Sequence, residues 1–468
     1  MRSIVWFRGK DLRVNDHPAL SLAGPDALLV FVVDPYFFVP ERAEKMPHRM
    51  QFLVQSLTAL EERICTLGGK LWFVPGRSVE VIPRLARIFG ADQVVAMRWS
   101  EPFGRERDRR IAESMNIPLV LLEGETLLPP GKLRTKAGRP YSVFTPFARS
   151  FRRSFSVSEK SVFTAFGNDP GLPAEIERVP CPTLKDLKLE KKPGLVTGGE
   201  RAAEGRLDTF LAGPGDGDRD RRNRLDCDGT SRLSTDLKFG LLSAREVWRR
   251  VVTSALPEAD KLCFTNELIW REFNYSTLWD SPHVLSKPFK SKWERFPWDG
   301  TTEHLEAWKS GCTGYPVVDA AARQLLKSGF VHNRARMIAA SFLTKHLMVN
   351  YRHGEAHYLQ WLTDGDWAQN SMGWQWAAGC GADAQPWFRI FNPMTQGKKF
   401  DPSGEYVKRW VPELRQMDPR HIHAPWIAPT SVLKRAGVIL GETYPSPVVD
   451  HSWARQRFLG AAKDFFAA

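Results

Sequence analysis

The sequence predicts an α/β N-terminal domain with a doubly wound parallel sheet, followed by an all-α domain. Short apolar, β-branched runs alternate with amphipathic helical patterns through the first third of the chain. Beyond residue 230, apolar residues recur at helical spacing and no strand-rich stretch interrupts them. A stretch rich in Pro, Gly and Lys separates the two regions and is typical of a surface connector. We therefore expect domains at 1–130 and 205–468, joined by a connector at 131–204.

The N-terminal pattern consists of strands that alternate with helices. We expect strands at 3–7, 27–33, 70–74, 92–97 and 117–122, and helices at 49–69, 78–90 and 104–115. The first of these helices has an apolar face formed by Phe52, Leu53, Leu57, Leu60 and Ile64. Such alternation predicts a parallel sheet covered on both faces, with ligands beyond the carboxyl ends of its strands. Because no G-x-G-x-x-G follows the first strand, we do not expect a dinucleotide site of that type.

The C-terminal half is expected to be helical throughout. Its most regular segments are 234–251, 264–279, 316–329 and 333–352. Within the first segment, Ser243 and Glu246 match the S-x-x-E capping box that marks a helix start.

Composition limits the class of protein and its partners. Of 468 residues 43% are hydrophobic, which allows a sizeable core and excludes wholesale disorder. A net charge of +13 fits a polyanion such as nucleic acid, although a merely basic soluble protein explains the charge equally well. The six cysteines form no C-x-x-C pair, so we expect neither a metal site nor a disulfide framework. We find no signal-peptide core or membrane-spanning run and expect a cytoplasmic protein without a membrane partner.

The stretch "DGTSRLSTDLKFG" at 228–240 places several hydroxyls where a loop becomes a helix. The hydroxyls of Thr230, Ser231 and Ser234, with the free N–H groups of a helix start, would form a phosphate cradle. An ordinary helix cap with spare serines explains the same residues.

Two later stretches place polar and apolar groups on one helix face. Glu267 and Trp270 are three apart, so a carboxylate and an indole could meet the same planar, polar ring. Asn333 and Met337 are four apart and also share a face. A core tryptophan beside a solvated glutamate, and a helix with a basic side, are the alternatives.

The stretch "GDWAQNSMGWQW" at 365–376 is unusually rich in tryptophan. Trp374 and Trp376 are two apart, which on a helix turns them by about 200° and excludes a shared pocket. One would face a substrate and the other a redox path through the protein. Two core tryptophans on opposite sides of one helix are the alternative.

In this order, the motifs resemble the photolyase/cryptochrome family, most closely its branch that repairs cyclobutane pyrimidine dimers in DNA. The resemblance extends from "VWFRGKDLRVNDHPAL" to "FRIFNPMTQGKKFDPSGEYVKRWVPEL", nearly the whole chain. Its most specific segments are "TGYPVVDAAARQL", "HNRARMIAASFLTK" and "NSMGWQWAAGCGADAQPWFRIFNP".

The resemblance implies an FAD, folded into a U, in the helical domain. The diphosphate would be held by Thr230, Ser231, Arg232, Leu233 and Ser234, and the ribityl, ribose and adenine side by Asp364, Gly365 and Asp366. Arg336 would pair with Asp364. Asn370 would lie opposite flavin N5, where plant-type cryptochromes tend to carry an acid and animal-type ones a cysteine. The asparagine therefore favours the repair branch.

The resemblance also implies a lesion pocket and a DNA surface. The residues that match the family's dimer contacts are Glu267, Trp270, Asn333, Met337 and Trp376. The two tryptophans would flank a flipped-out dimer, while the glutamate and the asparagine would bond its polar edges. The residues expected to bind DNA are Arg222, Arg271, Arg334, Arg389 and Lys399.

A relay of aromatic residues would carry electrons to the flavin. Trp374 matches its proximal member and Trp298 its distal one, but the middle position is Tyr351, where the family usually has tryptophan. A neutral tyrosine is harder to oxidise and must shed its phenolic proton. A detour could run through Trp361, Trp367 and Trp387, or these could be core residues.

The sequence departs from the family in a few places. "FRGKDLR" carries one residue more than the usual F-R-x-D-L-R, Asp218 stands where a tyrosine is common, and Ser371 replaces a second asparagine. A second, antenna chromophore is expected in the α/β domain. "EPFGRERD" at 101–108 resembles the deazaflavin-using branch and lacks the Asn-Glu pair of folate binders, so we expect a deazaflavin rather than a folate.

The function implied is that of a deoxyribodipyrimidine photo-lyase, a carbon–carbon lyase that acts as a monomer on UV-damaged DNA without a protein partner. Its catalytic residues would be Glu267, Asn370, Trp374, Tyr351 and Trp298. The alternatives are a (6-4) photolyase and a blue-light-sensing cryptochrome. The (6-4) branch uses a histidine pair where this chain has His332 and Asn333, and cryptochromes often carry a long tail, whereas this sequence ends at residue 468. A non-enzymatic nucleic-acid binder would have no need of the FAD residues.

Overall fold

The computed structural model describes residues 1–157 and 163–467, and the chain forms two compact units. Unit 1 comprises Met1–Asp216, Ser231–Pro282 and Thr363–Ala368. Unit 2 comprises Gly217–Thr230, His283–Leu362 and Gln369–Ala468. Unit 1 thus contains the α/β part together with some helices of the part predicted to be all-α. The domain boundaries expected from the sequence stay a prediction.

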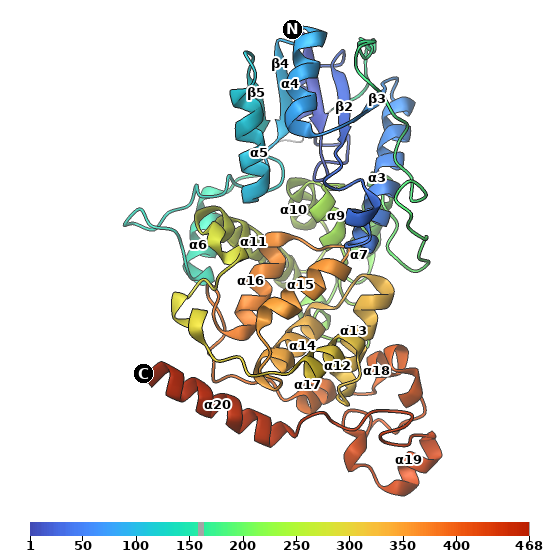
Figure 1. Cartoon of the computed structure of the whole chain (residues 1–468), viewed down its shortest axis with the longest axis vertical. Coiled ribbons are helices and arrows are strands. Elements are labelled where there is room, and N and C mark those ends of the chain that lie inside the picture. Colours follow the sequence, from blue (N-terminus) through green and yellow to red (C-terminus); the bar gives the residue numbers. More distant parts are fainter. Residues whose placement is uncertain (158–162, 468) are drawn as a thin grey trace. The chain divides into compact units, whose positions relative to one another are not determined.

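Unit 1 is built on a five-stranded parallel sheet (Figure 1). Its strands are β1 (Ser3–Phe7), β2 (Leu28–Val33), β3 (Leu71–Pro75), β4 (Gln93–Met97) and β5 (Leu119–Leu122). They lie in the order β3-β2-β1-β4-β5, so the chain moves outward on one side of β1 and then on the other. The carboxyl ends of β1 and β4 therefore form the switch point at which open α/β sheets bind ligands.

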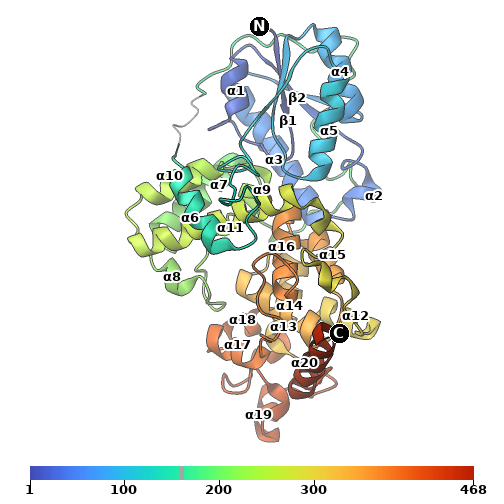
Figure 2. The same ribbon diagram turned by 90° about the vertical axis from the view of Figure 1, so that its left-hand side faces the viewer.

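Helices cover both faces of this sheet, as the alternating pattern predicts. They are α1 (Pro18–Ala23), α2 (Pro40–Ala43), α3 (Pro47–Thr66), α4 (Ser78–Phe89) and α5 (Pro102–Glu113). Figure 2 shows α1 on one side of the sheet and α4 and α5 on the other. Every residue of β1 is buried, because Ile4 and Trp6 pack toward one helical layer and Val5 and Phe7 toward the other. The five apolar residues predicted for the face of α3 are all buried.

The rest of the described part of unit 1 consists of helices and long loops. Its helices are α6 (Phe144–Ser154), α7 (Glu200–Ala212), α9 (Ser234–Phe239), α10 (Ala244–Thr253) and α11 (Glu258–Asp280). The segment 131–204, expected to be a connector, contains α6, which packs on α11 and buries Phe147 and Phe151. The predicted cap of α10 is confirmed, since Ser243 Oγ accepts a hydrogen bond from the N–H of Glu246 at 2.9 Å.

The described part of unit 2 consists of helices and loops. Its α-helices are α8 (Asp218–Arg221), α12 (Thr302–Ser310), α13 (Pro316–Ser328), α14 (Asn333–Lys345), α15 (Tyr351–Trp361), α17 (Pro393–Phe400), α18 (Glu405–Trp410), α19 (Thr430–Ala436) and α20 (His451–Ala467). Short 3-10 helices lie at Pro282–Leu285, Ser291–Arg295, Pro412–Leu414 and Pro425–Ile427. Helix α16 (Trp367–Ala378) contributes most of its length to this unit. The core forms around α13, which packs on α14 and α18.

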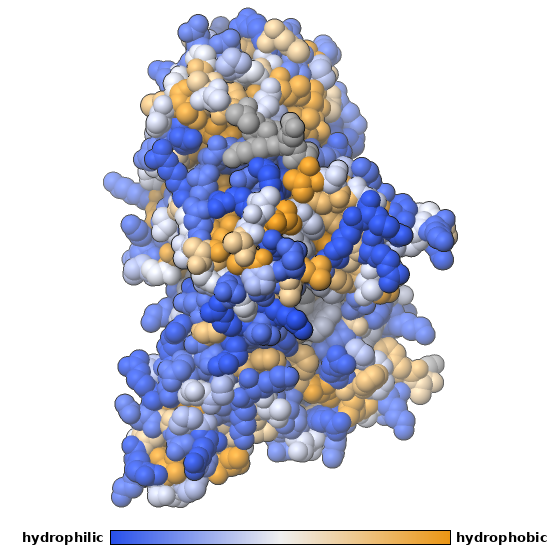
Figure 3. Space-filling model, turned by 180° about the vertical axis from the view of Figure 1, so that it is seen from behind, coloured by the Kyte–Doolittle hydropathy of each residue, from blue (hydrophilic) through white to orange (hydrophobic). Residues whose placement is uncertain are grey.

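The molecular surface is mainly polar. In the view of Figure 3, hydrophilic side chains cover much of the surface and hydrophobic ones lie among them. Among the described residues, no helix combines the length and apolar character that crossing a bilayer requires. All six cysteines are free thiols.

Candidate functional site

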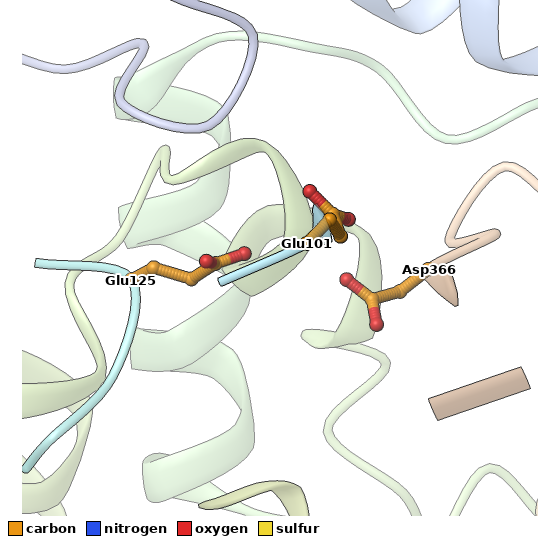
Figure 4. Close-up of side chains that lie close together, drawn as sticks. All are labelled: Glu101, Glu125 and Asp366. Carbon is orange, nitrogen blue, oxygen red and sulfur yellow. The ribbon is translucent and has the colours of Figure 1, made fainter. Parts of the chain in front are cut away.

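The switch point of the sheet gathers buried charged residues from three strand ends. Lys10 follows β1, Glu101 follows β4 and Glu125 follows β5. Lys10 Nζ donates a hydrogen bond of 2.5 Å to Glu101 Oε1 and a second bond to Glu125 Oε1. Glu101, Glu125 and Asp366 turn their carboxylates toward one another (Figure 4), and all three are buried. These groups meet because the carboxyl ends of neighbouring parallel strands lie at one edge of the sheet.

Asp366, one of the predicted flavin residues, is held by side chains of the same unit. Tyr275 Oη on α11 donates a hydrogen bond of 2.7 Å to Asp366 Oδ2, and Lys10 Nζ lies 3.5 Å from the same oxygen. Arg49 Nη1 on α3 donates to the Gly365 carbonyl at 3.3 Å. The segment 364–366 is therefore fixed by contacts to the sheet and to two helices.

The electrostatics of this cluster follow from burial and proximity. Burial alone would lower the pKa of Lys10, but the carboxylates of Glu101, Glu125 and Asp366 outweigh burial and raise it. Burial raises the pKa of Glu101 to about 7, although the Lys10 ammonium opposes this rise. Lys10 is therefore charged at neutral pH and contacts all three carboxylates, while Arg49 and Arg271 add positive charge nearby.

The predicted diphosphate segment of unit 1 begins in a strained backbone conformation. Arg232 has φ of 53°, a left-handed conformation that costs a non-glycine residue about 1 kcal/mol or more. Such strain concentrates at ligand sites, which agrees with a phosphate-binding role for residues 231–234. The helix that follows, α9, is anchored on α7, where Arg206 donates two hydrogen bonds to Asp236 at 2.9 and 2.5 Å. Thr230, the remaining predicted member, belongs to unit 2.

The other predicted flavin residues lie in unit 2. Asn370 on α16 donates a hydrogen bond of 2.9 Å from Nδ2 to the backbone carbonyl of Glu355. Its amide oxygen therefore points away from this bond and suits a ligand N–H donor, such as the protonated N5 of a reduced flavin. Arg336 on α14 donates from Nε to the Val331 carbonyl at 2.7 Å. Its predicted pairing with Asp364 stays a prediction. The residues present fit an FAD.

The predicted lesion residues of unit 1 lie on α11. Glu267 is exposed and Trp270 is partly exposed. The Trp270 indole stacks on the Phe144 ring at the start of α6, with centroids 3.7 Å apart and planes within 4°. Phe273 meets the same indole edge-on at 5.8 Å. Because Phe144 covers one face of the indole, Trp270 is held in a fixed orientation.

The predicted lesion residues of unit 2 lie on α14 and α16. Asn333 Nδ2 approaches Met337 Sδ at 3.8 Å, which confirms that these two side chains share a helix face. On α16, Trp374 is buried and Trp376 is partly exposed, so the two indoles lie in different environments as predicted.

Basic residues of unit 2 gather near α14 and α17. Arg334 Nη2 donates to Asn223 Oδ1 at 2.7 Å, and the Arg334 guanidinium lies over the Phe400 ring at 4.4 Å. Lys399 lies over the same ring at 5.4 Å. Burial and the charge of Arg222 lower the pKa of Arg334, which shows that the two cations are close. Three predicted phosphate ligands therefore form one positive patch.

The remaining predicted DNA residues lie elsewhere. The carbonyl of Arg389 accepts a hydrogen bond of 2.8 Å from Lys345 Nζ. Burial, together with the charge of Arg389, lowers the pKa of Lys345 to about 7. Arg271 is directed into unit 1, where Nη1 donates to the Glu125 carbonyl at 2.7 Å. A DNA contact by Arg271 stays a prediction that these internal bonds do not favour.

The aromatic relay residues of unit 2 have different surroundings. The Trp374 indole lies edge-on to Tyr358 at 5.1 Å and to Trp308 at 5.7 Å. A side chain at Gly354 would collide with this indole, because a Cβ atom there would lie 2.2 Å from Trp374 Cη2. Trp298 is partly exposed and stacks on Trp293 with centroids 6.2 Å apart.

Tyr351 occupies the first position of α15 and is buried. Its Oη has no hydrogen-bond partner among the residues that the structure describes, and burial raises the pKa of its phenol. A tyrosine loses its proton when it is oxidised, and no described side chain accepts a hydrogen bond from this phenol. The structure therefore supports the expectation that Tyr351 oxidises reluctantly. Of the detour candidates, Trp361 and Trp387 are partly exposed and Trp367 is exposed.

Two family models match the chain. One, described as the FAD binding domain of DNA photolyase, matches residues 264–464, and the other, described as DNA photolyase, matches residues 3–166. The chain belongs to the photolyase/cryptochrome family. Members of this family therefore supply the comparison for both units, and the chain carries the family's FAD-binding domain.

Relatives within the family match the chain from end to end. The deoxyribodipyrimidine photo-lyase of Agrobacterium fabrum is 37% identical over 98% of this chain and 97% of its own length. A class III photolyase of Agrobacterium tumefaciens shares the fold with a TM-score of 0.91 at 36% identity, covering 100% of this chain and 98% of that one. A Synechocystis cryptochrome gives 0.88 at 29% identity, covering 98% and 99% of the two chains. A Sulfolobus tokodaii photolyase with two FAD molecules gives 0.83 at 28% identity, covering 99% and 100%. The predicted fold class is confirmed.

Sequence reasoning missed the side chains that support the predicted family residues. Lys10, Tyr275 and Arg49 hold the segment 364–366, and Phe144 backs Trp270. One signal was present for Lys10, since it lies in the motif that is one residue longer than usual. Nothing in the local sequence marks the others, because each is distant along the chain from the residue it contacts.

Proposed function

We propose that the protein is a deoxyribodipyrimidine photo-lyase, an enzyme that uses light to repair cyclobutane pyrimidine dimers in DNA. The observation that carries the proposal is its 37% identity, over nearly the full length of both chains, to an enzyme of that name. The asparagine at position 370, expected opposite flavin N5, agrees with a repair enzyme.

Each unit carries residues that are proposed to contact the flavin. Ser231, Ser234 and Thr230 would donate hydroxyl hydrogen bonds to the diphosphate, beside the positive charge of Arg232. Asp366, held by Tyr275 and Lys10, would accept hydrogen bonds from the sugar or adenine side, beside Asp364 and Gly365. The Asn370 amide oxygen would accept the N5 hydrogen. Bound, reduced FAD supplies the light-driven electron that opens the cyclobutane ring.

The residues proposed to contact the dimer lie on α11 in unit 1 and on α14 and α16 in unit 2. The face of Trp270 opposite Phe144 stacks on the flipped-out bases, and Trp376 supplies a second apolar wall. Glu267 and Asn333 bond the polar edges of the pyrimidines, with Met337 beside them. Glu267 would contribute most once negative charge develops on the dimer, when its carboxyl group shares a proton with the dimer and donates an O–H hydrogen bond that the negative charge strengthens.

The surrounding DNA would be bound by its phosphates. Arg222, Arg334 and Lys399 form one patch, and Arg389 is a further candidate. These contacts carry no sequence information, which suits an enzyme that must find a lesion in any sequence. The net charge of +13 supports rapid, salt-sensitive association with DNA.

A second chromophore in the α/β part is proposed to be a deazaflavin. Phe103, within the 101–108 motif, is 49% exposed and stacks on Tyr36, which is 43% exposed, with centroids 4.8 Å apart. This pair offers a flat surface for a planar chromophore. Reconstitution with a deazaflavin and, separately, with a folate tests the proposal, since only the chromophore that binds would transfer excitation energy to FAD. Failure of the deazaflavin to bind contradicts it.

One assay tests the main proposal. FAD-loaded, chemically reduced protein is illuminated with oligonucleotides that contain either a cyclobutane dimer or a (6-4) photoproduct, and repair is quantified against dark controls. We expect repair of the cyclobutane dimer alone. Repair of the (6-4) product alone would assign the protein to the rival branch.

A signalling cryptochrome is the second candidate, and the fold of the Synechocystis cryptochrome at a TM-score of 0.88 favours it. The same assay discriminates the two functions. A protein that binds FAD and responds to light but repairs neither lesion would be a sensor.

A further inference from the structure

The turn after β1 carries Lys10 into the interior of unit 1. Lys10 is 6% exposed, and its ammonium contacts Glu101, Glu125 and Asp366. Lys10 lies in "FRGKDLR", which has one residue more than the usual motif of the family. The charge of a buried ammonium in contact with three carboxylates is compensated only while the carboxylates remain within ion-pair distance.

The turn is clamped onto the C-terminal end of α9, the helix that begins at the predicted diphosphate residue Ser234. Leu12 N–H donates to the Phe239 carbonyl at 3.2 Å, and Arg13 Nη1 donates to the Gly240 carbonyl at 2.9 Å. Gly240 ends α9 with φ of 64°, and a Cβ atom there would lie 2.0 Å from the Lys10 carbonyl oxygen. Glycine at 240 is therefore required both by the backbone angle and by this close approach. The backbone of Lys10 has little freedom to move.

The two predicted flavin segments of unit 1, 231–234 and 364–366, are thus connected through this turn. Its backbone packs against the end of α9, which begins at Ser234, and its Lys10 ammonium reaches Asp366. Tyr275 bonds the same Asp366 oxygen, but as a neutral donor it cannot offset the repulsion from Glu101 and Glu125.

We infer that Lys10 is a positioning residue for FAD: its ammonium holds the Asp366 carboxylate in place between two other carboxylates and so slows release of the cofactor. This inference rests on the proposed function, because it requires Asp366 to contact FAD. Without Lys10, Asp366 would turn away from Glu101 and Glu125 or take up a proton, and either change alters the group that the flavin meets. Lys10 itself need not touch the cofactor.

The first experiment measures FAD release from the full-length holoenzyme, followed as the rise in free-flavin fluorescence after dilution. Lys10→Met should raise the release rate by about tenfold, a change of the size expected when a buried ion pair such as that of Lys10 with Asp366 is lost. Arg8→Met is the matched control, because Arg8 lies two residues away and is equally buried in a 2.7 Å ion pair with Asp108. It should lower thermal stability comparably yet leave FAD release within about twofold of wild type. Equal release rates in the two variants would overturn the inference.

The second experiment asks whether Lys10 acts through Asp366. Asp366→Asn should itself speed FAD release, and adding Lys10→Met to it should produce little further change. Full additivity of the two effects would show that Lys10 acts by another route and would refute the inference. If Asp366→Asn leaves FAD release unchanged, then the placement of Asp366 at the flavin is wrong and the inference falls with it.

A charge-balanced variant keeps the test valid if Lys10→Met does not fold. Lys10→Met combined with Glu101→Gln removes one charge of each sign, so the net charge of the cluster is the same as in wild type. This variant should fold and still release FAD faster than Glu101→Gln alone. The same release rate in both would count against the positioning role.

Discussion

The stack of Phe144 on Trp270 predicts that a residue behind the lesion site controls affinity for the lesion. With ring centroids 3.7 Å apart and planes within 4°, the two rings lie face to face with little offset. Aromatic pairs contribute about 0.5–1.5 kcal/mol beyond the area they bury, and this is the energy that holds the Trp270 indole in place. Phe144→Ala should therefore weaken binding of a dimer-containing oligonucleotide by about two- to tenfold.

The assay separates binding from chemistry. Affinity is measured in the dark by fluorescence anisotropy, and repair per absorbed photon is then measured at saturating DNA. The variant should lose affinity but keep its yield at saturation, and Phe144→Tyr should retain both. Phe155→Ala is the matched control, because Phe155 packs edge-on against a different tryptophan, Trp248, at 5.1 Å. Unchanged affinity in a folded Phe144→Ala protein would refute the role given to the stack.

Three further predictions concern the relay, the DNA surface and pH. Tyr351→Trp should speed light-driven reduction of bound FAD, while repair by pre-reduced enzyme stays unchanged, because the buried phenol is a poor electron carrier. Arg334→Ala should lower the slope of log affinity against log salt by about one, as expected for the loss of one phosphate contact. Burial, and then the neighbouring His451, lowers the pKa of His346 to about 3. An unfolded histidine takes up a proton near pH 6.5, so the contribution of neutral His346 is complete above that pH and is lost as pH falls toward 3. Below pH 6.5, the free energy of unfolding should therefore fall less steeply with decreasing pH in His346→Gln than in wild type. The difference should be up to about 1.4 kcal/mol per pH unit, measured by urea unfolding.

Each of these predictions has a clear contrary outcome. If Tyr351→Phe photoreduces as fast as wild type, electrons bypass this position, and single phenylalanine substitutions at Trp361, Trp367 and Trp387 identify the route. A salt slope that does not change in Arg334→Ala removes this arginine from the contacts with DNA. Parallel pH profiles for wild type and His346→Gln would mean that the histidine is accessible to protons in the folded state.

The strands and helices of the sheet domain could be predicted because their signals are local. Each apolar run of five or six residues became a strand, and each amphipathic stretch between runs became a helix. Helix α6 was hidden because its segment begins among Pro, Gly and charged residues, and its buried face is formed by only a few residues such as Phe147 and Phe151. Its stability comes from packing on α11, which no local pattern contains.

The candidate site likewise contains some contacts that the sequence could predict and others that it could not. Pairs spaced by three or four residues, such as Asn333 and Met337, could be placed on one helix face from the sequence alone. The support of Asp366 by Lys10 joins residues 356 positions apart in the numbering, and only the sheet topology explains why the turn after β1 reaches it. Which charged side chains are buried together depends on the tertiary fold, and the distances between them cannot be obtained from the sequence.

The contact of Gly354 with Trp374 bears on the rate at which light would reduce bound FAD through the proposed relay. The indole lies where any side chain at 354 would have to be, so even the methyl group of alanine would displace it. Electron tunnelling slows exponentially as the gap between donor and acceptor widens. Gly354 on α15 therefore helps to fix the position of the Trp374 indole, and in the proposed relay the distance of the first electron transfer would depend on that position.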